Sequence, residues 1–204
     1  MATLIQTLGG RDRFVDRMNW LHESGILYLG DEQAFLNVFL YHYAGRPALS
    51  AERAHQYFPS LFNDTVVGIP GNDDSGAMGS FEAFVLMGFF PNAGQDVYFI
   101  IPPFFESISI KNGQTGKTAT IRNINFDASH KNIYIQSATL DGAPYTRNWL
   151  QHSFFLEGGV LELTLGPQES AWGTRPEDVP PSLGPFVNGT TTKRWAMEEM
   201  EFDW

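Results

Sequence analysis

The chain has 204 residues, of which 43% are hydrophobic, so it can bury a sizeable core and is neither disordered nor fibrous. Its formal net charge of -10 argues against a nucleic acid or an anionic membrane as partner. It has no cysteine, which excludes disulfides, thiolate nucleophiles and cysteine-based metal sites. No apolar run approaches the roughly 20 residues that cross a bilayer, and the first residues do not have the pattern of a secretion signal.

Residues 1–92 are predicted to be helical. The stretch RDRFVDRMNWLHES carries apolar residues at helical spacing (Phe14, Met18 and Leu21). The stretch DEQAFLNVFLYHYAG predicts a second helix from Asp31 to Gly45, with the glycine as its end.

Two further helices are expected before residue 92. The third follows Ser50, which can cap it, and Pro59 is expected to bend or end it. The fourth follows the loop at Asp74 and runs toward Gly88. Because the connections between these four helices are short, neighbouring helices should be antiparallel, as in a bundle or a helical toroid.

After Pro91 the apolar period changes from about four residues to two, which is typical of strands. Four segments rich in β-branched and aromatic residues are separated by turn signals at Asn112-Gly113, Asp141-Gly142 and Gly158-Gly159. They predict a small antiparallel β unit over residues 93–166. Residues 167–204 are predicted to be a Pro-rich C-terminal tail whose last part, KRWAMEEMEFDW, forms a surface strap or a frayed end. The predicted fold class is therefore α+β.

The most informative polar residues are Asn72, Asp73 and Asp74, just where the fourth helix should begin. A side chain there can cap free backbone N–H groups, and the helix dipole favours its ionised form. An ionised carboxylate suits a general base or a metal ligand rather than a general acid. An ordinary helix cap is the alternative interpretation, since capping is the commonest use of Asp before a helix.

A second acidic pair, Asp31 and Glu32, stands at the start of the second predicted helix. If the helices alternate in direction around a toroid, both acidic pairs line the same mouth. Oxygen ligands of this kind suit calcium, and carboxylates also bind sugar hydroxyls. The alternative is two unrelated caps. The histidines do not have metal-ligand spacing, and Ser75 lacks the GxSxG turn of a serine hydrolase.

Four collinear blocks of the sequence resemble glycoside hydrolase family 92, the calcium-dependent α-mannosidases. The string GIPGNDDSGAMGSFEAFVLMGFFP resembles the segment around the catalytic carboxylates of that family, and GDEQAFLNVFLYHYAGRP resembles its GNE block. VYFIIPPFFESISI resembles a strand pair, and YIQSATLDGAPYTRNWLQHSFFLEGGVLELTLGP resembles the C-terminal β segment, especially of fungal members.

The resemblance implies a partial (α/α)6 toroid of about four helices followed by the β unit. It also implies a calcium-dependent, inverting, exo-acting α-mannosidase of α-1,2-type mannosides in N-glycans or mannans. Carried over by position, Asp74 matches the general base and Asp73 the middle acid of the catalytic block. Asn72 and Glu32 match substrate-binding positions, and Glu32 with Asp31 matches the calcium site. The expected cofactor is Ca2+, and the expected partner is a mannose-containing oligosaccharide.

The chain departs from the family pattern in ways that affect the expected activity. Asn72 stands where many members have Asp, Asp31 where Asn is usual, and Leu36 where a His is expected to face the sugar. The general acid of the family lies upstream of the resembling region, and four helices cannot close a toroid. The isolated chain is therefore expected to have little or no activity, and an N-terminal partner chain or self-association is expected to cover its apolar surface.

Two other functions stay open at this point. The chain can be a non-catalytic carbohydrate-binding or assembly fragment, or a plain α+β domain whose acidic loop only caps a helix. The compartment is not determined by the sequence, although the parent family is often extracellular or vacuolar. Asn63-Asp64-Thr65 and Asn188-Gly189-Thr190 fit the N-glycosylation pattern, which matters only in the secretory pathway.

Overall fold

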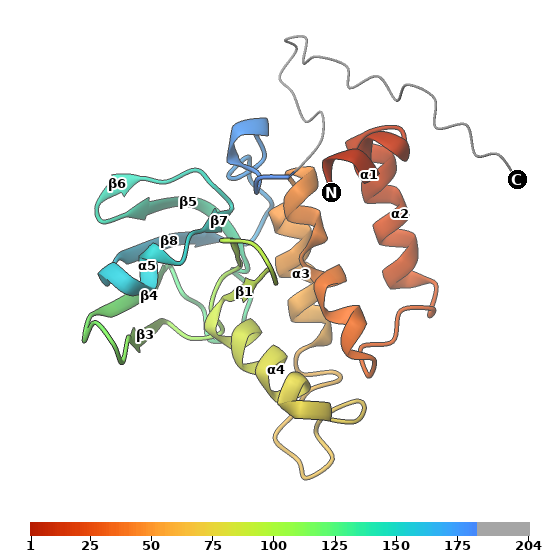
Figure 1. The fold of residues 1–204 in the computed structure, drawn as a ribbon, viewed down its shortest axis with the longest axis horizontal. Coiled ribbons are helices and arrows are strands. Elements are labelled where there is room, and N and C mark those ends of the chain that lie inside the picture. The colour runs from red at the N-terminus through yellow and green to blue at the C-terminus, as the bar shows by residue number, and fades with distance from the viewer. Residues whose placement is uncertain (183–204) are drawn as a thin grey trace, which may run out of the picture.

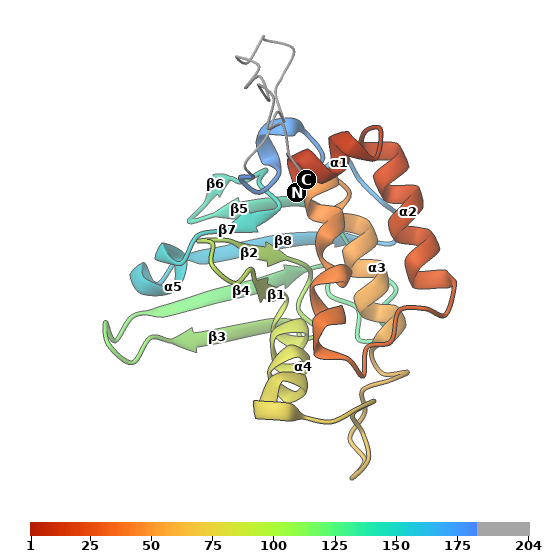
Figure 2. The ribbon, with the colours of Figure 1, turned by 45° about the vertical axis from the view of Figure 1, so that its right-hand side comes forward.

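A computed structural model describes residues 1–182 of the chain, in which a helical half lies beside a β half (Figure 1). Figure 2 shows the helices of residues 1–57 stacked on one side and the strands running toward them from the other, with α4 below the junction. The observed mixture of helices and sheets agrees with the predicted α+β class. No helix among residues 1–182 is long and apolar enough to cross a membrane.

The helical half is made of four α-helices and three short 3-10 helices. They are α1 (Ala2–Thr7), α2 (Arg11–Glu23), η1 (Glu32–Val38), η2 (Leu40–Ala44), α3 (Pro47–Tyr57), η3 (Asp74–Gly76) and α4 (Ala77–Met87). The β half adds a fifth α-helix, α5 (Ser153–Glu157), and the 3-10 helix η4 (Pro176–Asp178) lies in the C-terminal part.

The predicted single helix from Asp31 to Gly45 is wrong, because the segment forms η1 and η2, which meet at Phe39. Most of its bulky residues are buried, and Val38, Phe39 and the Tyr41 side chain are fully so. Several residues of this stretch, among them two Phe and two Tyr, have weak helix propensity, so packing on several sides at once can impose the tighter 3-10 form. The predicted end at Gly45 is confirmed by its left-handed φ of 67°.

The third and fourth helices begin at other residues than predicted. α3 starts at Pro47, whose fixed φ suits the first helical position, so Ser50 lies inside the helix instead of capping it. It ends at Tyr57, two residues before Pro59, as expected from the proline. α4 starts only at Ala77, because the short helix η3 comes between Asp74 and the regular helix.

The strands form two sheets. One has the order β1-β2-β7 (Phe89–Pro91, Tyr98–Ile100 and Trp149–Leu150) and the other β3-β4-β8-β5-β6 (Ser107–Lys111, Thr118–Ile124, Val160–Gly166, Tyr134–Leu140 and Ala143–Pro144). The predicted turn at Asp141-Gly142 is confirmed, since these two residues join β5 to β6 with φ of 51° and 79°.

The expectation of a purely antiparallel β unit is wrong at one pair, because β4 and β8 are parallel. The connection between them, residues 125–159, is long enough to hold β5, β6, β7 and α5, and it therefore lets the chain cross over and enter in the same direction. β8 lies in the middle of the sheet, and its Leu161 and Leu163 are fully buried.

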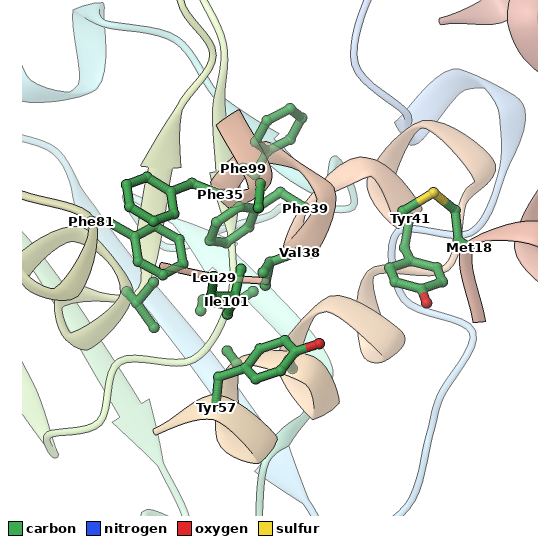
Figure 3. Close-up of a cluster of buried hydrophobic side chains, with 14 of the residues drawn as sticks. Met18, Leu29, Phe35, Val38, Phe39, Tyr41, Tyr57, Phe81, Phe99 and Ile101 are labelled. Carbon is green, nitrogen blue, oxygen red and sulfur yellow. The ribbon is translucent and has the colours of Figure 1, made fainter. Parts of the chain in front are cut away.

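Two clusters of buried apolar side chains hold the fold together. The first joins the helices to β2, and Figure 3 shows rings from η1, η2, α3, α4 and β2 gathered in it. The second fills the space between the two sheets and α5. Because α4 and β2 contribute to the first cluster, the helical half and the sheets share apolar contacts along their junction.

The first residues of the predicted C-terminal tail pack against the β half. Trp172 is 8% exposed and donates its Nε1–H to the carbonyl oxygen of Tyr145 at 2.8 Å. Asp178 is 2% exposed and accepts hydrogen bonds from Thr146 and Arg175. Residues 167–182 are therefore anchored, whereas the predicted strap KRWAMEEMEFDW lies outside the described residues.

Candidate active site

Two loops that are 40 residues apart in sequence meet at the candidate site. The hydroxyl of Tyr28 donates a hydrogen bond to the carbonyl oxygen of Pro70. The next contact is between two glycines, because a Cβ atom on Gly71 would lie 2.3 Å from the carbonyl oxygen of Gly30. Only glycine allows this backbone approach. The loop before Asp31 therefore lies directly against the loop that carries Asn72.

Beneath these loops, η1 and α4 pack through aromatic rings. Phe35 and Phe81 lie face to face (Figure 3). Their ring centroids are 4.2 Å apart, and their planes differ by 9°. Met78, fully buried, approaches the Gly30–Gly71 contact from α4. The two acidic segments at the starts of η1 and α4 are thus neighbours, fixed by a shared core.

Asp73 caps helix α4, although the helix begins only at Ala77. Its Oδ1 accepts hydrogen bonds from the backbone N–H groups of Met78 at 2.8 Å and Gly79 at 3.2 Å. These are N–H groups of the first turn that no helical carbonyl can satisfy. The cap interpretation therefore applies to Asp73, and one of its two carboxylate oxygens is occupied by the protein backbone.

Asp74 differs from its neighbour. Its side chain is exposed and makes no hydrogen bond or ion pair within residues 1–182. Ser75, directly after it, has a φ of 56°, and Gly76 follows with a φ of 75°, so the chain reverses sharply here. A serine in the left-handed region is uncommon and costs of order 1 kcal/mol. This turn keeps Asp74 out of the helix and open to a ligand.

The second acidic segment contributes one unusual atom. Glu32 is half-buried, and its Oε1 is buried without any hydrogen-bond partner in the described residues. A buried carboxylate oxygen without a partner is costly, so it indicates a missing donor or cation. Asp31 and Asn72 are exposed on either side of the Gly30–Gly71 contact.

Positive charge is missing from this group of carboxylates. None of Asp31, Glu32, Asp73 and Asp74 forms a salt bridge with a Lys or Arg in residues 1–182. The junction therefore favours ligands that bring a cation or hydroxyl donors.

The described residues do not form a complete calcium site. Within residues 1–182 no group of three or more His, Cys, Asp or Glu side chains is arranged to hold a metal ion. Calcium takes 6–8 oxygen ligands, and the chain offers a buried, unpartnered Glu32 Oε1 as one fitting oxygen.

The sequence assigns no role to the histidines, and three of them lie in surroundings that shift their pKa. Burial lowers the pKa of His22, His42 and His55 to about 4, with Arg53 adding to the effect at His22 and His130 at His55. These rings are neutral near pH 7; those of His22 and His42 are hydrogen-bonded, and that of His55 stacks on Phe104. Sequence reasoning did not single out Tyr28 or Gly30, because their contacts depend on tertiary structure and leave no local pattern.

Two hollows of about 410 and 450 Å³ lie elsewhere on the surface. The first lies between the β5–β6 hairpin and α5, and the second lies between the end of α4, the end of β3 and α5. Asp31, Glu32, Asp73 and Asp74, which form the acidic junction of the two loops, line neither of these two hollows.

Comparison with known proteins identifies the family. Residues 1–167 match the sequence profile of the glycosyl hydrolase family 92 catalytic domain. The chain belongs to glycosyl hydrolase family 92. An uncharacterized secreted glycosidase of Arthroderma benhamiae is 68% identical over 184 residues, which are 90% of this chain and 24% of that protein.

Solved family 92 structures have the same fold as this chain. The family GH92 α-mannosidase BT3965 of Bacteroides thetaiotaomicron in complex with mannoimidazole has a TM-score of 0.78 at 23% identity, over 85% of this chain and 25% of that one. The family GH92 inverting mannosidase BT2199 of the same organism has a TM-score of 0.77 at 24% identity, over 87% and 27%. The chain thus spans about a quarter of the length of these relatives.

Proposed function

We propose that this chain is part of the catalytic domain of a calcium-dependent, inverting, exo-acting α-mannosidase that acts on α-1,2-type mannosides of N-glycans or mannans. The observation that carries the proposal is the acidic junction, where exposed Asp74 and half-buried Glu32 lie on adjoining loops without a cationic partner. Membership of family 92 and the likeness to solved mannosidases support it. In this proposal the helical half is a segment of an (α/α)6 toroid.

Asp74 is the general base in this mechanism. Its carboxylate, unpartnered and exposed, takes a proton from the water that attacks the anomeric carbon. Asp73 holds the loop by capping α4, and its second oxygen stays available to a ligand. Asn72 and Glu32 receive sugar hydroxyls. In an inverting hydrolase the general acid lies about 6.5–9.5 Å from the base, and here it is supplied by the part of the domain outside this chain.

In this proposal Glu32 and Asp31 supply oxygen ligands for a calcium ion. A bound calcium ion would hold sugar hydroxyls, and Glu32 Oε1 is the buried oxygen placed to contact it. Because residues 1–182 supply too few carboxylates for a complete site, the chain alone should bind calcium weakly.

Reconstitution tests the catalytic proposal. The Arthroderma relative is expressed without the region that matches this chain, and the two polypeptides are combined and assayed on an α-1,2-linked mannobiose with and without calcium. We expect activity only from the mixture and only with calcium, and a loss of about 10²-fold or more with Asp74→Asn. Glu52→Gln, an exposed carboxylate on α3, is the matched control and should leave activity unchanged. A fully active Asp74→Asn mixture would disprove the assigned base.

A non-catalytic carbohydrate-binding or assembly fragment is the second candidate function. The observation that favours it is the exposure of large apolar side chains on the helical half, such as Leu4, Trp20 and Ile26, which suits docking to a partner chain. Calorimetric titration of the chain with calcium and then with mannose separates the two candidates. Calcium-dependent mannose binding, together with an inactive reconstituted mixture, would favour this second function.

A further inference from the structure

The loop between α3 and α4 projects below the body of the molecule (Figures 1 and 2). Part of it is closed on itself: the N–H of Asn63 donates to the carbonyl oxygen of Gly68 at 3.0 Å, and the N–H of Gly68 donates to that of Thr65 at 3.0 Å. A Cβ on Gly68 would lie 1.9 Å from the backbone carbonyl oxygen of Asn63, so the turn requires glycine. Residues 63–68 therefore form a defined turn and not an open coil.

The side chain of Asn63 has a particular arrangement within this turn. Its Oδ1 accepts hydrogen bonds from Thr65, from the hydroxyl at 2.7 Å and from the backbone N–H at 3.2 Å. Its Nδ2 has no hydrogen-bond partner within residues 1–182, and the residue is exposed. The Nδ2 atom, to which a glycan is attached in an Asn-Asp-Thr pattern, is thus accessible. The side-chain oxygen of Asn63 is held by the threonine of the same pattern.

The same turn presents two apolar side chains to solvent. Val66 is 104% exposed and Val67 is 81% exposed, higher than any other large hydrophobic residue in residues 1–182. A cover over two adjacent exposed valines would be favourable, because it removes apolar surface from water. A group attached to Asn63 would lie close enough to provide that cover. The turn brings the backbone of Asn63 against Gly68, the residue after Val67.

We propose that Asn63 carries an N-linked glycan when the protein passes through the secretory pathway, and that the first sugars of this glycan cover Val66 and Val67. The 68% identical relative is named a secreted glycosidase, which supports passage through that pathway. The inference does not depend on mannosidase activity. Sugar rings have apolar faces that can pack on valine methyl groups, while their hydroxyls remain hydrated.

The modification is an ordinary group transfer from a lipid-pyrophosphate-linked oligosaccharide. Asn63 Nδ2 attacks the anomeric carbon of the first sugar, the C–N bond forms and the C–O bond to pyrophosphate breaks. The amide nitrogen gives one proton to a base of the transferase, and the lipid pyrophosphate leaves. The exposed turn lets the folded protein keep this group without a rearrangement.

The site is tested by secreting the full 204-residue chain from a fungal host behind a cleavable signal and mapping its glycopeptides. We expect a glycan on Asn63 that is absent from Asn63→Gln and Thr65→Ala. Asp64→Ala is the matched control, because it changes the same turn but keeps the pattern and should keep the glycan. Asn188→Gln removes the second pattern and leaves the mass shift at Asn63. An unmodified Asn63 in the secreted wild-type chain would overturn the proposal.

The covering role has its own readout. Enzymatic removal of the glycan from the folded protein should increase the fluorescence of the hydrophobic dye 8-anilinonaphthalene-1-sulfonate and increase self-association in sedimentation. The same treatment should change neither quantity in the double variant Val66→Ser and Val67→Ser. Equal increases in both proteins, or none in either, would show that the glycan does not cover the valines. Sugar binding and mannosidase activity do not enter these readouts, so a failure here is distinguishable from a failure of the proposed function.

Discussion

His42 Nε2 lies 2.8 Å from the carbonyl oxygen of Ile100, so a fully buried imidazole joins the helical half to strand β2. Its Nδ1 lies 3.0 Å from both the Ser50 hydroxyl and the Phe39 carbonyl oxygen. The amide of Asn148 continues the connection, because its Nδ2 donates to the carbonyl oxygens of His42 at 3.1 Å and Gly173 at 2.8 Å. The junction between the helices and the sheets is therefore held by buried hydrogen bonds as well as by apolar contacts.

The burial of His42 at this junction predicts that the protein loses stability in mild acid. Burial lowers the pKa of His42 from 6.5 to about 4, so below pH 6.5 the unfolded chain binds a proton that the folded chain does not. The free energy of unfolding should be highest above pH 6.5 and should fall between pH 6.5 and 4, with His42 alone accounting for on the order of 3 kcal/mol. Urea unfolding at a series of pH values measures this.

His22 and His55 have pKa values lowered in the same direction, to about 4, and steepen the expected fall. His55 stacks on Phe104 and makes no hydrogen bond within residues 1–182. The variant His55→Gln should therefore fold and show a shallower pH dependence than the wild type. A free energy of unfolding that stays constant from pH 7 to pH 4.5 would contradict the assignment of these rings as neutral.

A second prediction concerns the glycine contact between the two acidic loops. A Cβ at position 71 would lie 2.3 Å from the Gly30 carbonyl oxygen and 2.7 Å from Met78 Cε. Gly71→Ala should therefore separate the loops and destabilise the protein by about 1–3 kcal/mol. Gly113→Ala is the matched control, since a Cβ there meets no atom within 4 Å. Equal melting temperatures of the two variants would show that the loops do not touch as described.

The sequence predicted the elements whose pattern is local. The strands around Ile121, Ala138 and Leu163 follow from alternating apolar residues, and the turn at Asp141-Gly142 follows from residues that tolerate positive φ. The parallel pairing of β4 with β8 was not predicted, because it depends on how a connection of 35 residues crosses the sheet.

The candidate site was predicted from local pattern, which does not give its geometry. A cap among residues 72–74 was expected, yet the choice of Asp73 depends on the left-handed turn at Ser75, which moves the start of the helix to Ala77. The contact between Tyr28 and Pro70 spans 42 residues and follows from the packing of the core beneath it. The proposed roles of Asp74 and Glu32 come from the family resemblance, and reconstitution would test them.

The third prediction concerns Arg53, which links α3 to α2 through hydrogen bonds and an ion pair. Its side chain is 9% exposed and donates hydrogen bonds to Glu23 at 2.7 Å, to Asn19 at 3.3 Å and to Gln56 at 2.8 Å. Arg53→Ala should cost about 2 kcal/mol or more, because it removes the partner of several polar groups and packed methylene groups. Glu23→Gln should cost less than about 1 kcal/mol, since Glu23 is 63% exposed and the ion pair is screened by water. A larger loss for Glu23→Gln than for Arg53→Ala in urea unfolding would contradict this ranking.

The last prediction separates the two adjacent aspartates. Asp73 Oδ1 accepts two hydrogen bonds from the first turn of α4, so Asp73→Ala should lower the free energy of unfolding by about 1 kcal/mol, within the range of 0.5–2 for a lost cap. Asp74 makes no such bond, and Asp74→Ala should change stability by less than about 0.5 kcal/mol. In the reconstituted enzyme the order should reverse, because Asp74→Ala removes the proposed base whereas Asp73→Asn keeps an oxygen that can accept the capping bonds. Urea unfolding and mannobiose hydrolysis measured on the same three variants test both parts. If Asp74→Ala destabilised the chain as much as Asp73→Ala, Asp74 would be a structural residue, and its exposure would no longer support a catalytic role.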